Sequence, residues 1–210
     1  MSGNTGMWVR AGALLLGIVC LGAPVRAGPA PEEEWPMLGH DAARSGATTA
    51  EVRPPFERKW CRLFPDEGLM AGVQPVVADG KVFVGTLAGK LHAMDAGTGK
   101  DAWVFQAGGA ILHAAAAAGG KVFFGRRDGK LYAIEAGSGK VRWAAPTDGP
   151  LLGSPAVDVK AGRANVGSED MYVYAFDLKD GKQAWQSTKL PGVSFRGYHP
   201  VVAPDGSVMV

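Results

Sequence analysis

The sequence is poor in the side chains that build disulfides and metal centres. Its 210 residues include two cysteines and four histidines, and no spacing of His, Cys, Asp or Glu resembles a zinc or calcium site. Once an N-terminal leader is removed, Cys61 would be the single cysteine, so we expect no internal disulfide and no metal. Because Cys61 follows Trp60 in an apparent strand, we expect it to be a small buried hydrophobe.

The sequence also lacks a large net charge of either sign. The chain carries 22 basic and 20 acidic residues, and removal of residues 1–27 would take away Arg10 and Arg26 and no acid. This balance gives no support to nucleic-acid or anionic-membrane binding. The sequence has no Gly-x-Ser-x-Gly nucleophile motif. Glycine-rich stretches such as Gly97-Thr-Gly99 are turns rather than phosphate cradles, since no helix follows them.

No sustained helical period and no long apolar run occur beyond the N-terminal segment. Residues 1–27 have the pattern of a secretory signal peptide, with Arg10, an apolar stretch from Ala11 to Leu21, and a cleavage site ending at Ala27. The apolar stretch is too short for a transmembrane helix. Cys20 is a poor lipid acceptor because bulky Val19 precedes it. We therefore expect a periplasmic or secreted protein with no transmembrane anchor.

What the sequence does contain is a repeat. The stretch 93–103, AMDAGTGKDAW, returns as AIEAGSGKVRW at 133–143 and as AFDLKDGKQAW at 175–185. The tryptophans are 40 and 42 residues apart, and Trp60 stands 43 residues before Trp103. Each unit holds four short apolar runs separated by Asp-Gly, Ala-Gly and Thr-Gly turns. Four strands in about 40 residues predict the blade of an all-β propeller.

The repeated residues have a mechanical interpretation as a docking motif between blades. The alanine is small where a neighbour comes close, the glycine suits a positive φ in a tight turn, and the indole offers a flat face for packing. Thr98, Ser138 and Asp180 precede the glycines and are placed to bond the turn backbone. The predicted docking residues are Ala93, Gly99, Trp103, Ala133, Gly139, Trp143, Ala175, Gly181 and Trp185.

The length predicts about four blades, with residues 28–50 as an N-terminal lead-in segment and 51–210 as a partial propeller. Its repeats end near Trp60, Trp103, Trp143 and Trp185, and a truncated blade follows. Residues 200–210 match 75–84 with one insertion, so the sequence stops in mid-blade. A partial propeller would expose apolar strand edges. We therefore expect the sequence to be a fragment of a longer protein.

The motif Ala-x-Asp-x-x-Thr-Gly-Lys-x-x-Trp resembles the tryptophan-docking repeat of the quinoprotein-type propellers. The opening segment Glu34 to Gly46 is similar to the N-terminal signature of many of these proteins. The family is named for dehydrogenases that bind pyrroloquinoline quinone. It also has non-catalytic members, such as the propeller lipoprotein of the outer-membrane β-barrel assembly machine. The resemblance implies a propeller that usually closes with seven or eight blades.

Candidate ligand contacts lie just before the innermost strands, which we expect to begin near Pro75, Ala115, Pro155 and Pro200. The innermost strands of a propeller line its axis, where loops form a funnel. Side chains placed there could present donors to an anionic or carbonyl-bearing ligand, although ordinary loop and rim positions are the simpler explanation. The candidates are Gln74, His113, Arg196, Tyr198 and His199.

Other polar residues have simpler interpretations. His92 occupies the position of Tyr132 and Tyr174 in the next repeats, so we expect a partly exposed strand position. The acidic runs Asp66-Glu67, Glu169-Asp170 and Glu32-Glu33-Glu34 are expected to be solvated surface groups.

Two classes of function remain. The first is an exported, non-catalytic propeller that serves as a scaffold for a protein partner or a small ligand, with no cofactor. The alternative is the N-terminal part of a pyrroloquinoline quinone-dependent alcohol or sugar dehydrogenase, which the resemblance would supply with the quinone and calcium. That enzyme class typically has an adjacent cysteine pair beside the cofactor and a carboxylate and amide set for calcium. Neither can be matched here residue by residue, which favours the scaffold.

Overall fold

The computed structural model describes residues 34–50 and 53–210. These residues belong to one compact unit, Pro31–Val210. The predicted signal peptide, residues 1–27, lies outside the described residues, as do Glu32 and Glu33. The described residues form strands and turns, and no helix among them is long and apolar enough to cross a membrane.

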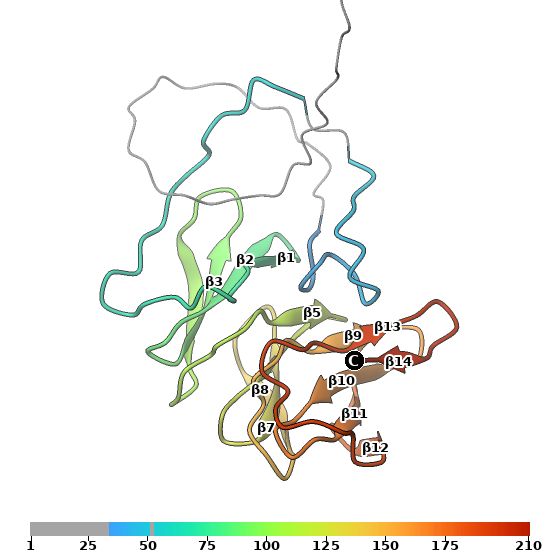
Figure 1. The fold of residues 1–210 in the computed structure, drawn as a ribbon. Helices are drawn as coiled ribbons and strands as arrows, with labels where there is room; N and C mark the ends of the chain where they lie inside the picture. Colours follow the sequence, from blue (N-terminus) through green and yellow to red (C-terminus); the bar gives the residue numbers. More distant parts are fainter. Residues whose placement is uncertain (1–33, 51–52) are drawn as a thin grey trace, which may run out of the picture. The chain divides into compact units, whose positions relative to one another are not determined.

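The strands form consecutive antiparallel sheets, each built from neighbouring stretches of chain (Figure 1). Three sheets have four strands in sequence order, and the last two strands form a pair. The all-β propeller fold predicted from the repeat is confirmed. The strands are β1 (Val76–Ala78), β2 (Lys81–Gly85), β3 (Lys90–Asp95) and β4 (Asp101–Gln106); β5 (Ala116–Ala118), β6 (Lys121–Gly125), β7 (Lys130–Glu135) and β8 (Val141–Pro146); β9 (Ala156–Asp158), β10 (Arg163–Gly167), β11 (Val173–Asp177) and β12 (Gln183–Gln186); and β13 (Val201–Val202) with β14 (Val208–Met209).

The three complete blades share one register. Ala93 on β3 lies opposite Phe83 on β2 and Trp103 on β4. Ala133 and Ala175 have the corresponding places in the second and third blades, and all three alanines are fully buried. In each blade the register shifts directly after this alanine. Such a β-bulge bends the outer strand and increases its twist. The repeat therefore specifies a bent outer strand as well as a turn.

The first and second blades each dock on the next through a tryptophan, Trp103 and Trp143. The Trp103 indole donates a hydrogen bond to the carbonyl of Ala136 at 2.9 Å, and Trp60 donates in the same way to Ala96. A Cβ at Gly139 would lie 2.8 Å from Cε3 of Trp103, so the turn must be glycine for the indole to lie against it. Gly139 also has a φ of +70°, a conformation that costs other residues energy. The residues of the docking motif therefore contact one another between blades, because the indole of one blade packs on the glycine turn of the next.

A second series of contacts joins the blades at the end of each second strand. Here the chain entering the next blade packs an apolar side chain directly onto a glycine. A Cβ at Gly85 would lie 2.4 Å from Ile111, and a Cβ at Gly125 would lie 2.7 Å from Leu151. These glycines do not have a positive φ among the described backbone. Space, rather than backbone conformation, is what requires glycine there.

The lead-in segment binds the inner strands of several blades. Trp35 forms a two-way backbone bridge with Val77 on β1, and the carbonyl of Pro36 accepts a hydrogen bond from Ala117 on β5. The carbonyl of Ala42 accepts from Val202 on β13. The segment, drawn in blue beside β1 in Figure 1, therefore ties separate sheets together.

Arg44 completes this connection. Its guanidinium donates to the carbonyls of Leu38, Ser154 and Pro200 at 2.9, 3.1 and 2.9 Å. Burial lowers the pKa of Arg44 to about 10, which leaves it charged at neutral pH. One charged side chain thus provides hydrogen bonds to carbonyls from the lead-in segment and from two blade entrances. Hydrogen bonds to a charged donor are stronger than neutral ones.

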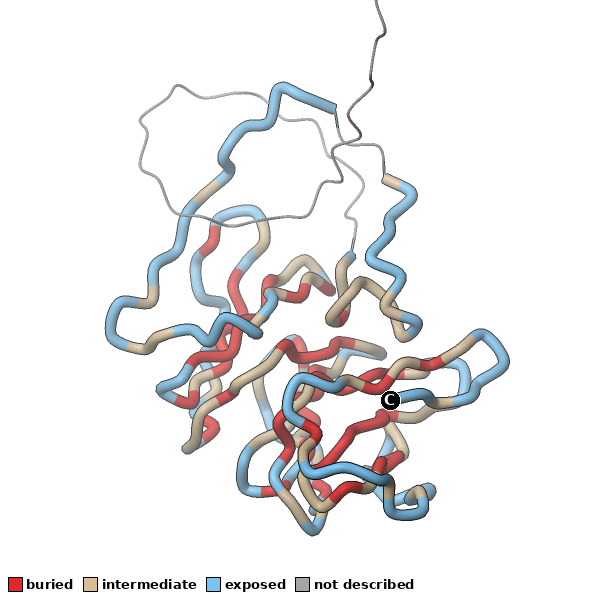
Figure 2. The backbone as a smooth tube through the Cα atoms, viewed as in Figure 1, coloured by how far each residue is buried: buried red, intermediate tan, exposed pale blue. Residues whose placement is uncertain are grey.

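Two local predictions about Trp60 and its neighbour are wrong. Residues 56–64 form no strand, although Trp60 docks as the blade tryptophans do. Cys61 is exposed rather than buried. With no sheet beside this segment, only one of its faces contacts the blade, and Cys61 lies on the other. Figure 2 shows buried backbone concentrated in the blade strands, while most of residues 53–75 are exposed or intermediate.

Candidate functional site

The structure brings together two of the five predicted ligand contacts. His113 precedes β5 and His199 precedes β13, and their rings meet edge to face with centroids 5.2 Å apart. Both side chains are half-buried. The meeting follows from the propeller, because equivalent blade entrances lie near one another around the inner strands. Whether the pair binds a ligand stays a prediction.

His199 is held in one hydrogen-bonding state by the backbone. The Ser154 N–H donates to Nδ1 of His199 at 2.9 Å, so this nitrogen must be unprotonated. Burial, with smaller contributions from the charges of Arg44 and His113, lowers the pKa of His199 to about 4. The ring is therefore neutral at pH 7 and carries its proton on Nε2. It serves the fold as a hydrogen-bond acceptor.

His113 retains an unused hydrogen-bonding group. Its Nδ1 is buried and has no hydrogen-bond partner among the described residues, and the same holds for the Oγ of Ser154. Burial and the nearby Arg196 charge lower the pKa of His113. Since unpaired buried polar groups are uncommon, these two atoms are the part of the pair with capacity for a further partner.

The other three predicted contacts are not part of this ring pair, although the charge of Arg196 acts on His113. Gln74 is exposed. Arg196 and Tyr198 instead line a separate depression of about 520 Å³, beside Met171, Val193 and Phe195. Tyr198 is 63% exposed and Val193 is 97% exposed. Four of the five residues are thus divided between a half-buried histidine pair and an open, largely apolar loop surface, and Gln74 belongs to neither.

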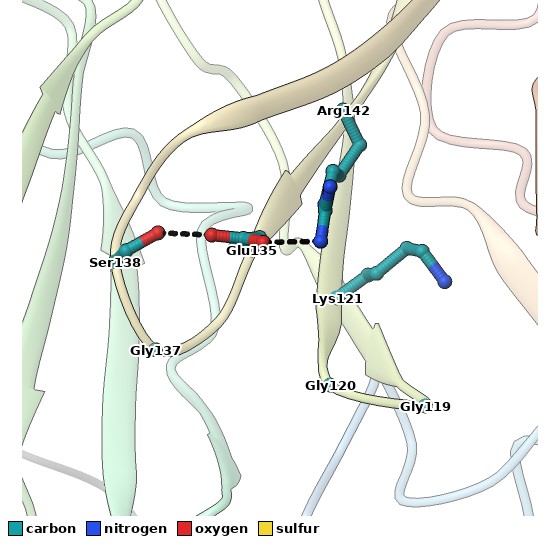
Figure 3. Close-up of a pocket in the computed structure, with 7 residues that line it drawn as sticks. All are labelled: Gly119, Gly120, Lys121, Glu135, Gly137, Ser138 and Arg142. Atoms are coloured by element: carbon teal, nitrogen blue, oxygen red, sulfur yellow. Dashed lines mark hydrogen bonds and ion pairs between the residues drawn. The ribbon is translucent and has the colours of Figure 1, made fainter.

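A second depression, of about 270 Å³, lies at the turns of the second blade (Figure 3). Its carboxylate, Glu135, accepts a hydrogen bond from Ser138 and pairs with Arg142. The Ser138 hydrogen bond, followed by the charges of Arg142 and Lys140, lowers the pKa of Glu135 despite some opposing desolvation. Glu135, Ser138 and Arg142 are therefore engaged with one another at the turn.

The turn residues before the docking glycines act as the sequence indicates. The Oγ1 of Thr98, the Oγ of Ser138 and the Oδ1 of Asp180 each accept the backbone N–H two residues later. These are local turn contacts.

The sequence prediction for the exposure of His92 is wrong. The side chain was expected to be partly exposed, but His92 is 3% exposed. Its Nε2 lies 2.8 Å from Oε2 of Glu67, and its Nδ1 lies 3.1 Å from Oδ1 of Asp101. Sequence reasoning missed this cluster because Glu67 comes from outside the repeat. The one available signal was a histidine where the other repeats have tyrosine.

The acidic pairs were also wrongly expected to be merely solvated. Glu169 accepts hydrogen bonds from the Phe195 N–H at 2.7 Å and from the Ser194 hydroxyl. Asp170 accepts from the hydroxyl of Tyr174. Each carboxylate ties a loop to a blade, as Glu67 does at His92. Asp66 is exposed, as expected.

Among residues 34–50 and 53–210, no group of three or more His, Cys, Asp and Glu side chains could hold a metal ion.

Successive four-stranded antiparallel sheets, joined by indoles docked on glycine turns, define a β-propeller of the quinoprotein type. A family model described as "Outer membrane protein assembly factor BamB" matches residues 39–125 and 106–209. The chain therefore belongs to this family. Comparison with curated proteins gave no significant match.

Solved structures are also similar to this chain. BamB from Moraxella catarrhalis is 26% identical, with a TM-score of 0.48, and the match covers 58% of this chain and 35% of that one. Quinohemoprotein alcohol dehydrogenase ADHIIG from Pseudomonas putida HK5 is 23% identical, with a TM-score of 0.55 and coverage of 76% and 27%. The corresponding enzyme from Comamonas testosteroni is 23% identical, with a TM-score of 0.56 and coverage of 76% and 28%.

The likeness to the two dehydrogenases supports the fold alone. The chain spans between about a quarter and about a third of the length of these three structures. Their chemistry therefore cannot be carried over from the similarity.

The cysteines and the buried polar groups bear on the quinone that the dehydrogenases imply. The cysteine pair typical of the enzymes has no counterpart, since Cys61 has no cysteine beside it in sequence and is exposed. The buried cation near the inner strands, Arg44, already donates to three carbonyls. Nδ1 of His199 is likewise occupied by the Ser154 N–H. No chemical step through the quinone is derived for these residues.

Proposed function

We propose that this chain is part of an exported, non-catalytic propeller that acts as a protein-binding scaffold in the assembly of outer-membrane proteins. The family match supports this role by its description. The periplasm is the matching compartment, since the predicted signal peptide would direct export.

The observation that carries the proposal is the occupation of the inner strands by the chain itself. Residues 35–44 bind β1, β5 and β13, and the Arg44 guanidinium uses its donors on backbone carbonyls. The guanidinium of Arg44 and Nδ1 of His199 therefore serve the fold, while Nδ1 of His113 and Oγ of Ser154 have no partner among the described residues. Such a molecule presents its loops and rims, rather than a reactive centre, to partners.

The loop surface formed by Leu190, Val193, Phe195, Arg196 and Tyr198 is the one we assign to a protein partner. It combines an apolar floor with an arginine and a tyrosine at its edge, and Tyr and Arg are enriched at protein interfaces. The occupant we commit to is a component of the outer-membrane assembly machinery, as the family description indicates.

The test is complementation in the source cell with its own copy of the gene deleted. The amount of folded outer-membrane protein is measured by heat-modifiable migration on gels. We expect the unmodified full-length gene to restore it and Val193→Asp to fail. Val159→Asp is the matched control, because Val159 is also exposed, at 65%, but lies in the β9–β10 turn. Failure of the unmodified gene, or equal effects of the two substitutions, would contradict the proposal.

A second measurement addresses the dehydrogenase alternative. The full-length protein is incubated with pyrroloquinoline quinone, calcium, an alcohol or aldose, and an artificial electron acceptor. We expect no turnover above a sample without protein. Quinone-dependent turnover would overturn the non-catalytic assignment.

Export is tested separately by cell fractionation and N-terminal mass spectrometry. We expect the mature protein in the periplasmic fraction, beginning at Gly28.

A further inference from the structure

The buried imidazole of His92 joins two parts of the chain that the repeat does not connect. The ring belongs to β3, Asp101 begins β4 of the same blade, and Glu67 lies in the segment before the blade. Phe64 covers the ring edge to face, with centroids 5.0 Å apart. The imidazole therefore lies between the blade and residues 62–68, shielded from water.

The charged groups around the ring form an alternating cluster. Lys90 on β3 contacts Oε1 of Glu67 at 2.8 Å, and Arg62 contacts Oδ2 of Asp101 at 2.7 Å. Burial would raise the pKa of Glu67, but hydrogen bonds from Lys90 and His92, with the charge of His92, outweigh it and lower that pKa to about 2. Glu67 is therefore ionised throughout the neutral range, in which lysine and arginine side chains normally remain charged.

Both ring nitrogens of His92 face carboxylate oxygens, so a hydrogen bond at each nitrogen requires an N–H at each. Two carboxylate oxygens lie within 2.8 and 3.1 Å of different ring nitrogens. A neutral imidazole has a single N–H, whereas an imidazolium has two. Only the charged ring can donate to Glu67 and Asp101 together. Loss of one proton leaves one carboxylate facing a nitrogen lone pair in a buried position.

The other two complete blades have a tyrosine instead of a histidine at this position. Tyr132 and Tyr174 occupy the position of His92 in the register, and their hydroxyls donate to Asp128 and Asp170. Burial, followed by these hydrogen bonds, raises the pKa of both phenols, so neither ionises near neutrality. Their carboxylates also come from the same blade. In the first blade, an imidazole replaces the phenol and its contact with Glu67 reaches outside the blade.

We propose that His92 is a pH-sensitive latch that holds residues 62–68 against the first blade when protonated and loosens them when it loses a proton. The backbone of this segment is tied to the blade by two further hydrogen bonds, from Leu87 to Gly68 and from Ala88 to Glu67. Trp60 remains docked through its own hydrogen bond to Ala96. Loosening is therefore confined to the stretch between Trp60 and the first blade.

Cys61 offers a direct readout. It is exposed and adjoins the latched segment, and with Cys20 replaced by serine it is the single thiol in the sequence. A nitroxide label on Cys61 reports local mobility by electron paramagnetic resonance between about pH 5 and about pH 8.5. We expect the mobile spectral component to grow about tenfold relative to the immobile one as pH rises, from the loss of a charged hydrogen bond.

Two substitutions decide whether His92 is responsible. His92→Tyr installs the residue of the other repeats, and His92→Gln keeps a polar side chain that does not titrate. We expect the pH response to disappear in both, with folding checked by far-UV circular dichroism. A label that shows no pH response in the unmodified protein would overturn the latch. So would an unchanged response in either folded variant, and His92→Gln alone suffices if tyrosine disrupts folding.

Discussion

Replacement of Trp103 by alanine should separate the docking of blades from the ordinary burial of an aromatic ring. The indole lies between the first two blades, against Phe83 at a centroid distance of 5.9 Å and against the turn at Gly139. Its N–H reaches the carbonyl of Ala136 at 2.9 Å. Truncation removes these contacts at once.

The expected cost follows from these contacts. Truncation of a core tryptophan costs about 3–5 kcal/mol, and the partial exposure of Trp103 places it near the lower end. The loss of the indole hydrogen bond adds about 1 kcal/mol. We therefore expect Trp103→Ala to destabilise the protein by about 4 kcal/mol. Trp103→Phe, which retains an aromatic ring, should cost about half as much.

Val104, the next residue on β4, provides the control. It is 45% exposed. We expect Val104→Ala to cost about 1 kcal/mol or less, as at surface sites. Urea unfolding followed by far-UV circular dichroism measures both variants. Equal losses for Trp103→Ala and Val104→Ala would refute the docking argument, because the contact of Trp103 with the second blade would then contribute nothing to stability.

Three further predictions follow from other contacts. Gly139→Ala should lower the urea midpoint by a shift worth about 2 kcal/mol, because φ is +70° and the new Cβ would meet Trp103, whereas Gly137→Ala enters open space and should change little. Arg44→Met should cost about 3 kcal/mol in the same assay, because three carbonyls lose a charged donor, while Arg142→Met removes only a surface ion pair and should cost under about 1 kcal/mol. Because the pKa of His199 is lowered to about 4 in the folded state, its contribution to stability is complete above the ordinary histidine pKa of about 6.5 and is lost as pH falls toward 4. The urea midpoint should therefore fall between pH 7 and pH 4.5, and His199→Gln should weaken this dependence; an equal slope in the variant would exclude His199 as its source.

The blades could be predicted because their determinants are local. The turn glycines, the buried alanines and the indoles recur at a fixed spacing, and β2 and β3 coincide with the runs 81–85 and 90–95. Trp60 shares the spacing but not the structure. Its docking partner is present in the first blade, whereas no described strand pairs with its own segment. Periodicity alone therefore predicted a strand there wrongly.

The polar sites were harder to predict because their partners are not repeated. His92 is buried by Glu67 and Phe64, which come from the non-repetitive segment before the first blade. Arg44 lies in the lead-in segment and reaches carbonyls beyond residue 150. The meeting of His113 and His199 is different, since both occupy blade entrances and their proximity follows from the repeat itself.

The contacts at the second-strand glycines could have been found from the sequence. Gly85, Gly125 and Gly167 end corresponding strands, and the apolar residues that cover them are Ile111, Leu151 and Phe195. Within each pair, the glycine precedes its partner by 26 to 28 residues, nearly constant along the repeat. A glycine in a strand has no side chain to pack, so its recurrence indicates close approach by another chain segment. The variation among Ile, Leu and Phe indicates that the gap between blades tolerates different shapes. It follows that the blade interface is specified by the glycine and only filled by its apolar partner.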